Sequence, residues 1–129
     1  MNRKWHILFC DDHIEICPVS DFIDQCPDKH QVKILRFLNL LEEMGPNLPR
    51  PYADVLHDGI HELRIRLSGA HMRLLYFFCY GDFIVLYYAF AKHTDRVPEK
   101  MIREVIDYRN DLLERVNRTQ MEKWLHADV

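Results

Sequence analysis

The sequence lacks any hydrophobic run long enough to cross a membrane. Its first apolar stretch, at residues 5–10, stops at Asp11 and Asp12, which makes it too short for the core of a signal peptide. We therefore expect a cytoplasmic protein that does not associate with membranes.

The sequence also lacks the spacing of a metal-binding or redox motif. No Cys-x-x-Cys pair occurs among its four cysteines, which are Cys10, Cys17, Cys26 and Cys79. In a reducing compartment we expect four buried free thiols. Three histidines in or beside loops and strands also lack the register of zinc ligands, namely His57, His61 and His71. We therefore expect no metal site and no cofactor.

An excess of positive charge is absent as well. The formal net charge is −3, which argues weakly against nonspecific nucleic-acid binding, because neutralising phosphates requires surplus Lys and Arg. The chain shows no internal repeat and no low-complexity tract. Its 129 residues, 48% of them hydrophobic, are enough for one folded domain and exclude a disordered chain. We expect that domain at residues 1–118, followed by a short extension at 119–129.

The apolar patterns predict strands at residues 4–9, 59–67, 72–80 and 83–91. The last three are separated by turn-like segments and should form an antiparallel meander. Helical patterns occur at residues 17–23, 28–44, 98–116 and, in the extension, 119–125. Asp28 and Gln31, like Thr119 and Glu122, have capping-box spacing. Residues 45–58 contain three prolines and are expected to form an irregular connection.

This order of elements predicts an α+β fold. We expect an antiparallel sheet with two N-terminal helices and a C-terminal helix packed over one sheet face.

Positive side chains gather on the predicted meander despite the acidic average. Alternation places Glu62, Arg64 and Arg66 on one face of the first meander strand. Together the three strands and their ends supply a possible phosphate-binding patch of Arg64, Arg66, Arg73, Lys92 and Arg96. Nearby tyrosines would be able to stack bases. The alternative is a solvated sheet face on which Arg64 forms ion pairs with Glu62 or Asp82, while the aromatic residues belong to the core.

His93 is the best candidate for acid–base chemistry, because it sits beside Lys92 at the predicted end of the last strand. An isolated histidine at a strand end is also commonly inert. The residues alone thus predict a small α+β domain that binds phosphate.

Several segments, taken in order, resemble the HigB-like, phage-derived branch of the RelE/ParE toxin superfamily. Residues 59–64 read Gly-Ile-His-Glu-Leu-Arg, similar to the Gly-x-x-Glu-Leu-Arg signature of that branch. Residues 48–51, Leu-Pro-Arg-Pro, resemble the loop before it, and residues 73–77 resemble its Arg-x-x-Tyr strand. Residues 90–94, followed by Pro98, resemble its Phe-x-Lys-Lys-Thr…Pro segment. The resemblance extends to about Arg115.

The resemblance implies a toxin of a type II toxin–antitoxin system. Such a toxin would be a metal-independent, ribosome-associated mRNA endoribonuclease, silenced by a helix-turn-helix antitoxin. The catalytic candidates are Arg73 and Lys92 for charge stabilisation, His93 as acid or base, and Tyr88 for stacking or assistance. The candidates for RNA binding are Arg64, Arg66, Arg50 and Arg96.

Two features depart from the branch pattern. His93 replaces the second lysine of the Lys-Lys-Thr segment, and the chain is acidic whereas the toxins are usually basic. Two alternatives therefore remain open. One is a non-catalytic binder on the same fold, such as a gyrase inhibitor of the ParE type or a degenerate phage protein. The other is an interaction domain that acts through its apolar C-terminal helix.

Overall fold

The computed structural model describes residues 4–10, 17–67, 69–91 and 96–126. In chain order, the elements are β1 (His6–Phe9), α1 (Pro18–Asp24), α2 (Asp28–Met44), the 3-10 turn η1 (Gly45–Asn47), β2 (Ala53–Val55), β3 (His61–Leu67), β4 (Ala70–Cys79), β5 (Phe83–Ala91), α3 (Glu99–Arg115) and α4 (Arg118–His126). The predicted α+β class is thus confirmed.

Within the described residues, the sheet has five strands in the order β1-β5-β4-β3-β2. Strands β3, β4 and β5 form the predicted antiparallel meander, and β1 joins the same sheet. The expectation of a fully antiparallel sheet was wrong, because β1 runs parallel to β5, with His6 opposite Phe83. A parallel pair needs a long connection between its two strands. Here that connection contains α1, α2, η1, β2, β3 and β4.

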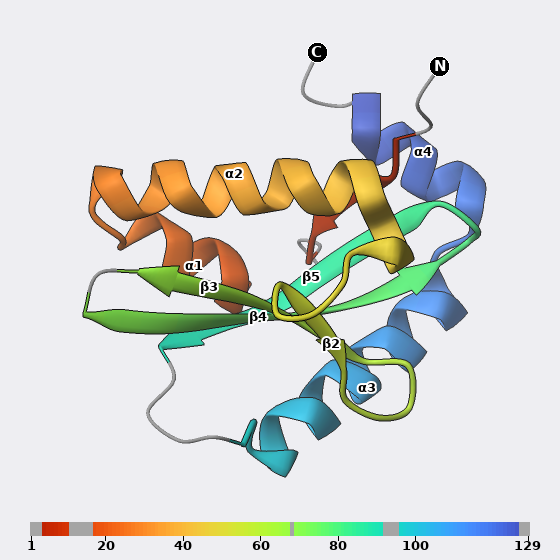
Figure 1. Cartoon of the computed structure of the whole chain (residues 1–129). Coiled ribbons are helices and arrows are strands. Elements are labelled where there is room, and N and C mark those ends of the chain that lie inside the picture. The colour runs from red at the N-terminus through yellow and green to blue at the C-terminus, as the bar shows by residue number, and fades with distance from the viewer. Residues whose placement is uncertain (1–3, 11–16, 68, 92–95, 127–129) are drawn as a thin grey trace.

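The helices cover both faces of the sheet, not one as expected. Figure 1 shows α1 and α2 on one side and α3 on the other. The physical reason lies in β4, where consecutive residues Leu74, Leu75, Tyr76 and Phe77 are all buried. Neighbouring strand residues point to opposite faces, so a strand buried at every position needs cover on both sides.

The helices α1, α2 and α3 begin within one residue of their predicted starts. Pro18 occupies the first turn of α1, as expected. The predicted capping box of α2 was wrong, because Pro27 is the N-cap and Asp28 is already helical. Gln31 Nε2 instead donates to the carbonyl oxygen of Ile23 at 2.8 Å, which joins α2 to α1. This bond uses the side chain that the capping box would have required.

The helix α2 ends at Gly45, as its sequence predicts. Gly45 has a φ of 52°, and a Cβ at this position would lie 2.3 Å from the indole nitrogen of Trp5. Only glycine fits this turn without displacing Trp5. The connection that follows is less irregular than expected, since it contains η1 and the short strand β2.

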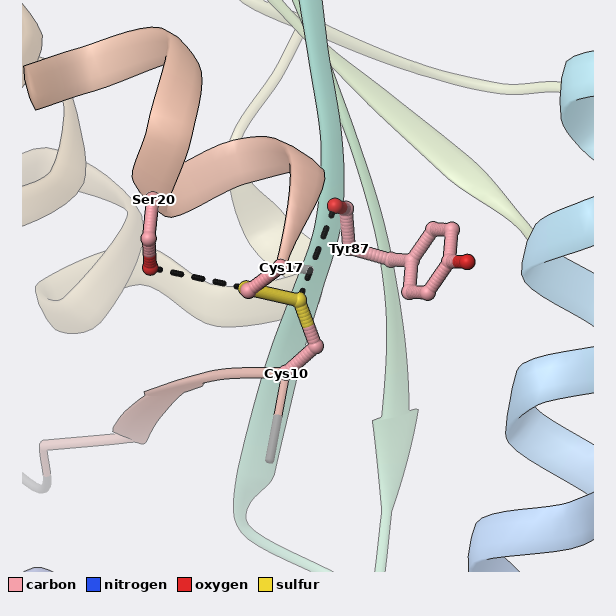
Figure 2. Close-up of a disulfide and its surroundings, with 4 residues drawn as sticks. All are labelled: Cys10, Cys17, Ser20 and Tyr87. Carbon is pink, nitrogen blue, oxygen red and sulfur yellow. Dashed lines mark hydrogen bonds between the residues drawn. A yellow bond between two sulfur atoms is a disulfide. The ribbon is translucent and has the colours of Figure 1, made fainter. Parts of the chain in front are cut away.

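The cysteines differ from the expectation of four buried thiols. Cys10 and Cys17 form a disulfide, with a Cα–Cα distance of 5.7 Å, which ties the end of β1 to the residue before α1 (Figure 2). Cys26 and Cys79 are free and only half-buried. Seven positions separate the paired cysteines, so their meeting depends on how β1 and α1 pack rather than on a local motif.

No helix in the described part of the chain is both long and apolar enough to cross a membrane.

Candidate functional site

The polar residues of β3 and β4 share one face of the sheet. Residues directly opposite each other in an antiparallel pair project to the same side. The register pairs Glu62 with Leu75, Arg64 with Arg73 and Arg66 with His71, while Tyr88 and Phe90 of β5 lie opposite Leu75 and Arg73. Tyr88 interacts with Glu104 of α3, which identifies this as the face that α3 covers. The predicted arginines thus lie on neighbouring strands.

Glu62 is the buried centre of this arginine cluster. Its side chain is only 2% exposed, yet Glu62 Oε1 accepts a hydrogen bond from Arg64 Nε at 2.5 Å. The same oxygen lies 3.5 Å from Arg73 Nε. A buried carboxylate needs such partners, because its charge is otherwise costly to remove from water. Glu62 therefore holds two like charges side by side on adjacent strands.

The side chain of Arg73 is mostly buried, at 13% exposure. Its Nη1 donates to the carbonyl oxygen of Met72 at 3.3 Å, while its Nε has no hydrogen-bond partner among the described residues. Burial lowers the pKa of Arg73, an effect opposed by Glu62 and reinforced by Arg64. Arginine still remains charged at neutral pH. Arg73 is thus a mostly buried cation whose Nε faces Glu62 without a hydrogen bond to it.

Asp54 of β2 holds the cluster from its other side. Arg64 Nη2 donates to Asp54 Oδ2 at 3.0 Å, and Arg50 Nη2 lies 3.1 Å from Asp54 Oδ1. Burial acts to raise the pKa of Asp54, but hydrogen bonds from the Val55 amide and from Arg50, with the charges of Arg50 and Arg64, outweigh it and lower that pKa. Asp54 is therefore an anion at neutral pH and links Arg50 to Arg64.

Three predicted arginines line one pocket at the outer side of β3. This pocket has a volume of about 360 Å³, and its walls are Phe37, Pro51, Tyr52, Arg64, Arg66, His71 and Arg73. We call it the edge pocket. Arg50 does not line it, and instead borders a separate pocket that includes His61 and Tyr76.

Besides the edge pocket and the pocket beside Arg50, a pocket of about 270 Å³ lies between the sheet and the start of α3. It contains Arg64 together with Glu62, Arg96 and Glu99. Arg96 thus shares a pocket with Arg64 but not with Arg73. Arg64 lines the edge pocket and the pocket at the start of α3, so it lies at the junction of these two.

Tyr88 lies on the site face but lines neither of these pockets. Burial raises the pKa of Tyr88, and its interaction with Glu104 raises it further. Its phenol therefore stays protonated at neutral pH. The neighbouring Tyr87 points away from the disulfide and toward α3, where its ring contacts that of Tyr108 (Figure 2).

Lys92 and His93 lie outside the described residues. They directly follow Ala91, which is the last residue of β5. The residue before Ala91, Phe90, lies opposite Arg73. Their place in the site remains a prediction.

The solvated ion-pair alternative is only partly correct. Arg64 does pair with Glu62, but this carboxylate is buried instead of solvated. Asp82 pairs with Arg118, at 2.7 Å, on the turn between β4 and β5. Sequence reasoning missed Phe37, Tyr52 and His71 as pocket residues. Pairing of Arg66 with His71 follows from the short turn after β3, but contact between Phe37 and Tyr52 depends on the tertiary fold.

No group of three His, Cys, Asp or Glu side chains able to hold a metal ion occurs among the residues that the structure describes.

The fold and the site together define a small α+β domain with clustered arginines on a partly covered sheet face, an arrangement suited to binding phosphate groups. The chain belongs to the family of phage-derived, Gp49-like proteins (DUF891), whose model matches residues 21–109. This is a RelE/HigB-like toxin family, so the predicted superfamily is confirmed, whereas the HigB branch is not. The matched region contains the whole arginine cluster, and membership implies an antitoxin partner. No curated protein matches the chain.

Proposed function

We propose that this protein is the toxin of a type II toxin–antitoxin pair and cuts ribosome-associated mRNA without a metal ion. The observation that carries the proposal is the pair of arginines held by buried Glu62. Arg64 and Arg73 are directly opposite on neighbouring strands, so one phosphate is able to contact both. Family membership supports the toxin assignment, with a helix-turn-helix protein as the proposed antitoxin.

The proposed reaction is a transesterification within the RNA chain. His93 takes the proton from a ribose 2′-hydroxyl, and the 2′-oxygen forms a bond to the adjacent phosphorus. The bond from phosphorus to the 5′-oxygen breaks, and that oxygen receives a proton from an acid. The products are a 2′,3′-cyclic phosphate and a free 5′-hydroxyl.

The positively charged side chains stabilise or position the phosphate on which negative charge develops in this reaction. Arg73 and Lys92 stabilise the extra negative charge of the phosphorane, while Arg64 positions the phosphate. Arg66, Arg96 and Arg50 would bind the flanking RNA backbone. The raised pKa of Tyr88 favours a role in stacking or hydrogen bonding over a role as base.

The test is induction of the gene with and without its neighbour, together with cleavage by the purified protein. We expect growth arrest that the neighbouring gene product relieves, and RNA fragments that carry 2′,3′-cyclic phosphate ends. Cleavage should persist in a chelator. Arrest without any RNA cleavage would favour the alternative of a non-catalytic binder on the same fold.

A further inference from the structure

We infer that the edge pocket receives one nucleobase of single-stranded RNA, stacked on Tyr52, while the phosphate beside it faces Arg66 and Arg73. This inference rests on the proposed function for the identity of the ligand as RNA. It adds a base-binding subsite next to the catalytic group of Arg73, Lys92 and His93, with Arg73 shared between the two.

Aromatic rings form one wall of the edge pocket. Tyr52 lies in the connection before β2 and is 42% exposed, and Phe37 comes from α2. Their ring centroids are 6.1 Å apart with an interplanar angle of 61°, an edge contact that leaves a tyrosine face uncovered by Phe37. Every base has a flat face, so an accessible ring of this kind binds bases with little sequence preference.

Cations also line the edge pocket. Arg64 is engaged by Glu62 and Asp54, but Arg66 is exposed and makes no ion pair with any described residue. The Nε of Arg73 is buried and faces Glu62 at 3.5 Å, so Arg73 contributes its positive charge to the pocket. Arg66 therefore offers donors to a phosphate, and the charge of Arg73 adds to the attraction. His71, opposite Arg66, adds a further nitrogen donor.

The size of the edge pocket restricts what it binds. Its volume of about 360 Å³ is at the small end of the range of about 300–1,000 Å³ that is typical of small-ligand sites. This suits a single nucleotide unit better than a helix of a partner protein. A lining that combines aromatic rings with guanidinium groups matches a base joined to a phosphate.

Continuity with the proposed catalytic site supports the same ligand. Arg73 and Arg64 belong both to the edge pocket and to the Glu62 cluster. A base bound against Tyr52 would therefore place its own phosphate at the cations proposed to act on the scissile bond. The edge pocket would position the RNA for cleavage.

The test compares two chains of equal length that the protein is unable to cut. One is a short 2′-O-methyl RNA, whose blocked 2′-oxygen prevents attack, and the other is its abasic counterpart. Wild-type protein should bind the chain with bases about tenfold more tightly, the order of magnitude of one base–aromatic stacking contact. Tyr52→Ala should remove this preference and leave binding of the abasic chain unchanged, whereas Tyr52→Phe should retain it.

The matched control is Phe9→Ala, which removes another exposed ring, 39% exposed, from a strand outside the edge pocket. It should behave as wild type, and thermal unfolding should show that all variants fold. Equal binding of both RNA chains by the wild type would overturn the inference. So would an unchanged preference in Tyr52→Ala, or a Tyr52→Ala defect confined to antitoxin binding, which would mark the edge pocket as an antitoxin contact.

The inference and the proposed function fail in different ways. Wild-type protein that prefers the chain with bases but never cuts RNA would retain the base subsite and refute the nuclease. Wild-type protein that cuts RNA, with Tyr52→Ala showing an unchanged preference, would retain the nuclease and refute the base subsite.

Discussion

Arginine–carboxylate clusters lie at the two ends of β4 and differ in their charge balance. At the first end, among the described residues, Arg64 pairs with Glu62 and Asp54, Arg73 lies beside Glu62, and Arg66 lines the same pocket without an ion pair. At the second, Arg118 pairs with two carboxylates, Asp82 at 2.7 Å and Glu122 at 2.9 Å. The first cluster keeps a surplus of positive charge and the second does not. Such a surplus beside a pocket is what distinguishes a candidate anion site from a structural ion pair.

The two clusters also differ in how far their central side chains are buried. Glu62 is buried and holds its arginines in place, whereas Arg118 is exposed and also donates to the carbonyl oxygen of Tyr80. Arg118 therefore joins α4 to the turn between β4 and β5, a structural task. We use this contrast to order four predictions, beginning with the largest effect.

Arg73→Ala should produce the largest change. Removal of a charge that stabilises the phosphorane typically lowers a rate by about a hundredfold to a thousandfold, so RNA cleavage and growth arrest should both be lost. The measurement is the rate of RNA cleavage in vitro. Arg36→Ala, at an exposed position on α2, is the matched control and should cleave at the wild-type rate. Full activity of Arg73→Ala would remove the functional distinction between the two clusters.

Glu62→Gln should reduce cleavage by a smaller factor. Glutamine keeps the shape of the side chain but not its charge, so Arg73 loses the carboxylate near its Nε while Arg64 keeps Asp54. A misplacement of a catalytic group by about 1 Å is able to lower a rate by about a hundredfold. Because Arg64 still holds the neighbouring strand, we expect a loss of about tenfold. The loss should appear mainly in kcat. A change in stability alone, with kcat unaltered, would show that Glu62 only supports the fold.

Arg118→Ala should leave cleavage unchanged and lower Tm by no more than a few degrees. The side chain of Arg118 is 44% exposed, and ion pairs made by such an exposed group contribute little to stability, although its partner Asp82 is only 15% exposed. Thermal unfolding and the cleavage assay measure the two properties on the same sample. A cleavage defect comparable to that of Arg73→Ala would contradict the assignment of this cluster to structure.

His57 should give the smallest effect, and one that depends on pH. Hydrogen bonds to Asp58 and Glu99 raise the pKa of His57 above its ordinary value of 6.5. A raised pKa means that this pairing stabilises the fold below pH 6.5 and is lost as the pH rises through the raised value. His57→Asn should therefore have a lower Tm than the wild type in mildly acidic solution and an equal Tm in alkaline solution. A difference that stays constant with pH would refute this account.

Much of the fold could be predicted because its signals are local. The alternation and short turns of residues 59–91 specify the meander, and the apolar stripe of residues 28–44 specifies α2. In contrast, the parallel pairing of β1 with β5 and the pairing of Cys10 with Cys17 depend on residues that meet only in the folded chain. The three-residue strand β2 is too short, and too close to prolines, to produce a periodic signal.

The site could be predicted in part for the same reason. Strand alternation and turn lengths place Arg64 near Arg73, as the register shows. Glu62 was recognised as a partner of Arg64, but its burial follows from cover by α3, whereas all helices were expected on a single unspecified face of the sheet. The aromatic wall of Phe37 and Tyr52 required knowledge of how α2 packs beside β3.

The position of β1 in the sheet has a consequence for the order in which the protein folds during translation. β1 is the first strand to leave the ribosome, but its neighbour β5 is the last one synthesised. Contacts between distant parts of a chain form late, because the long connecting segment must first be synthesised and then ordered. The nascent chain therefore holds its first strand without a partner until synthesis has passed Ala91. The sheet is therefore complete only after β5, which is far from β1 along the chain, has been synthesised.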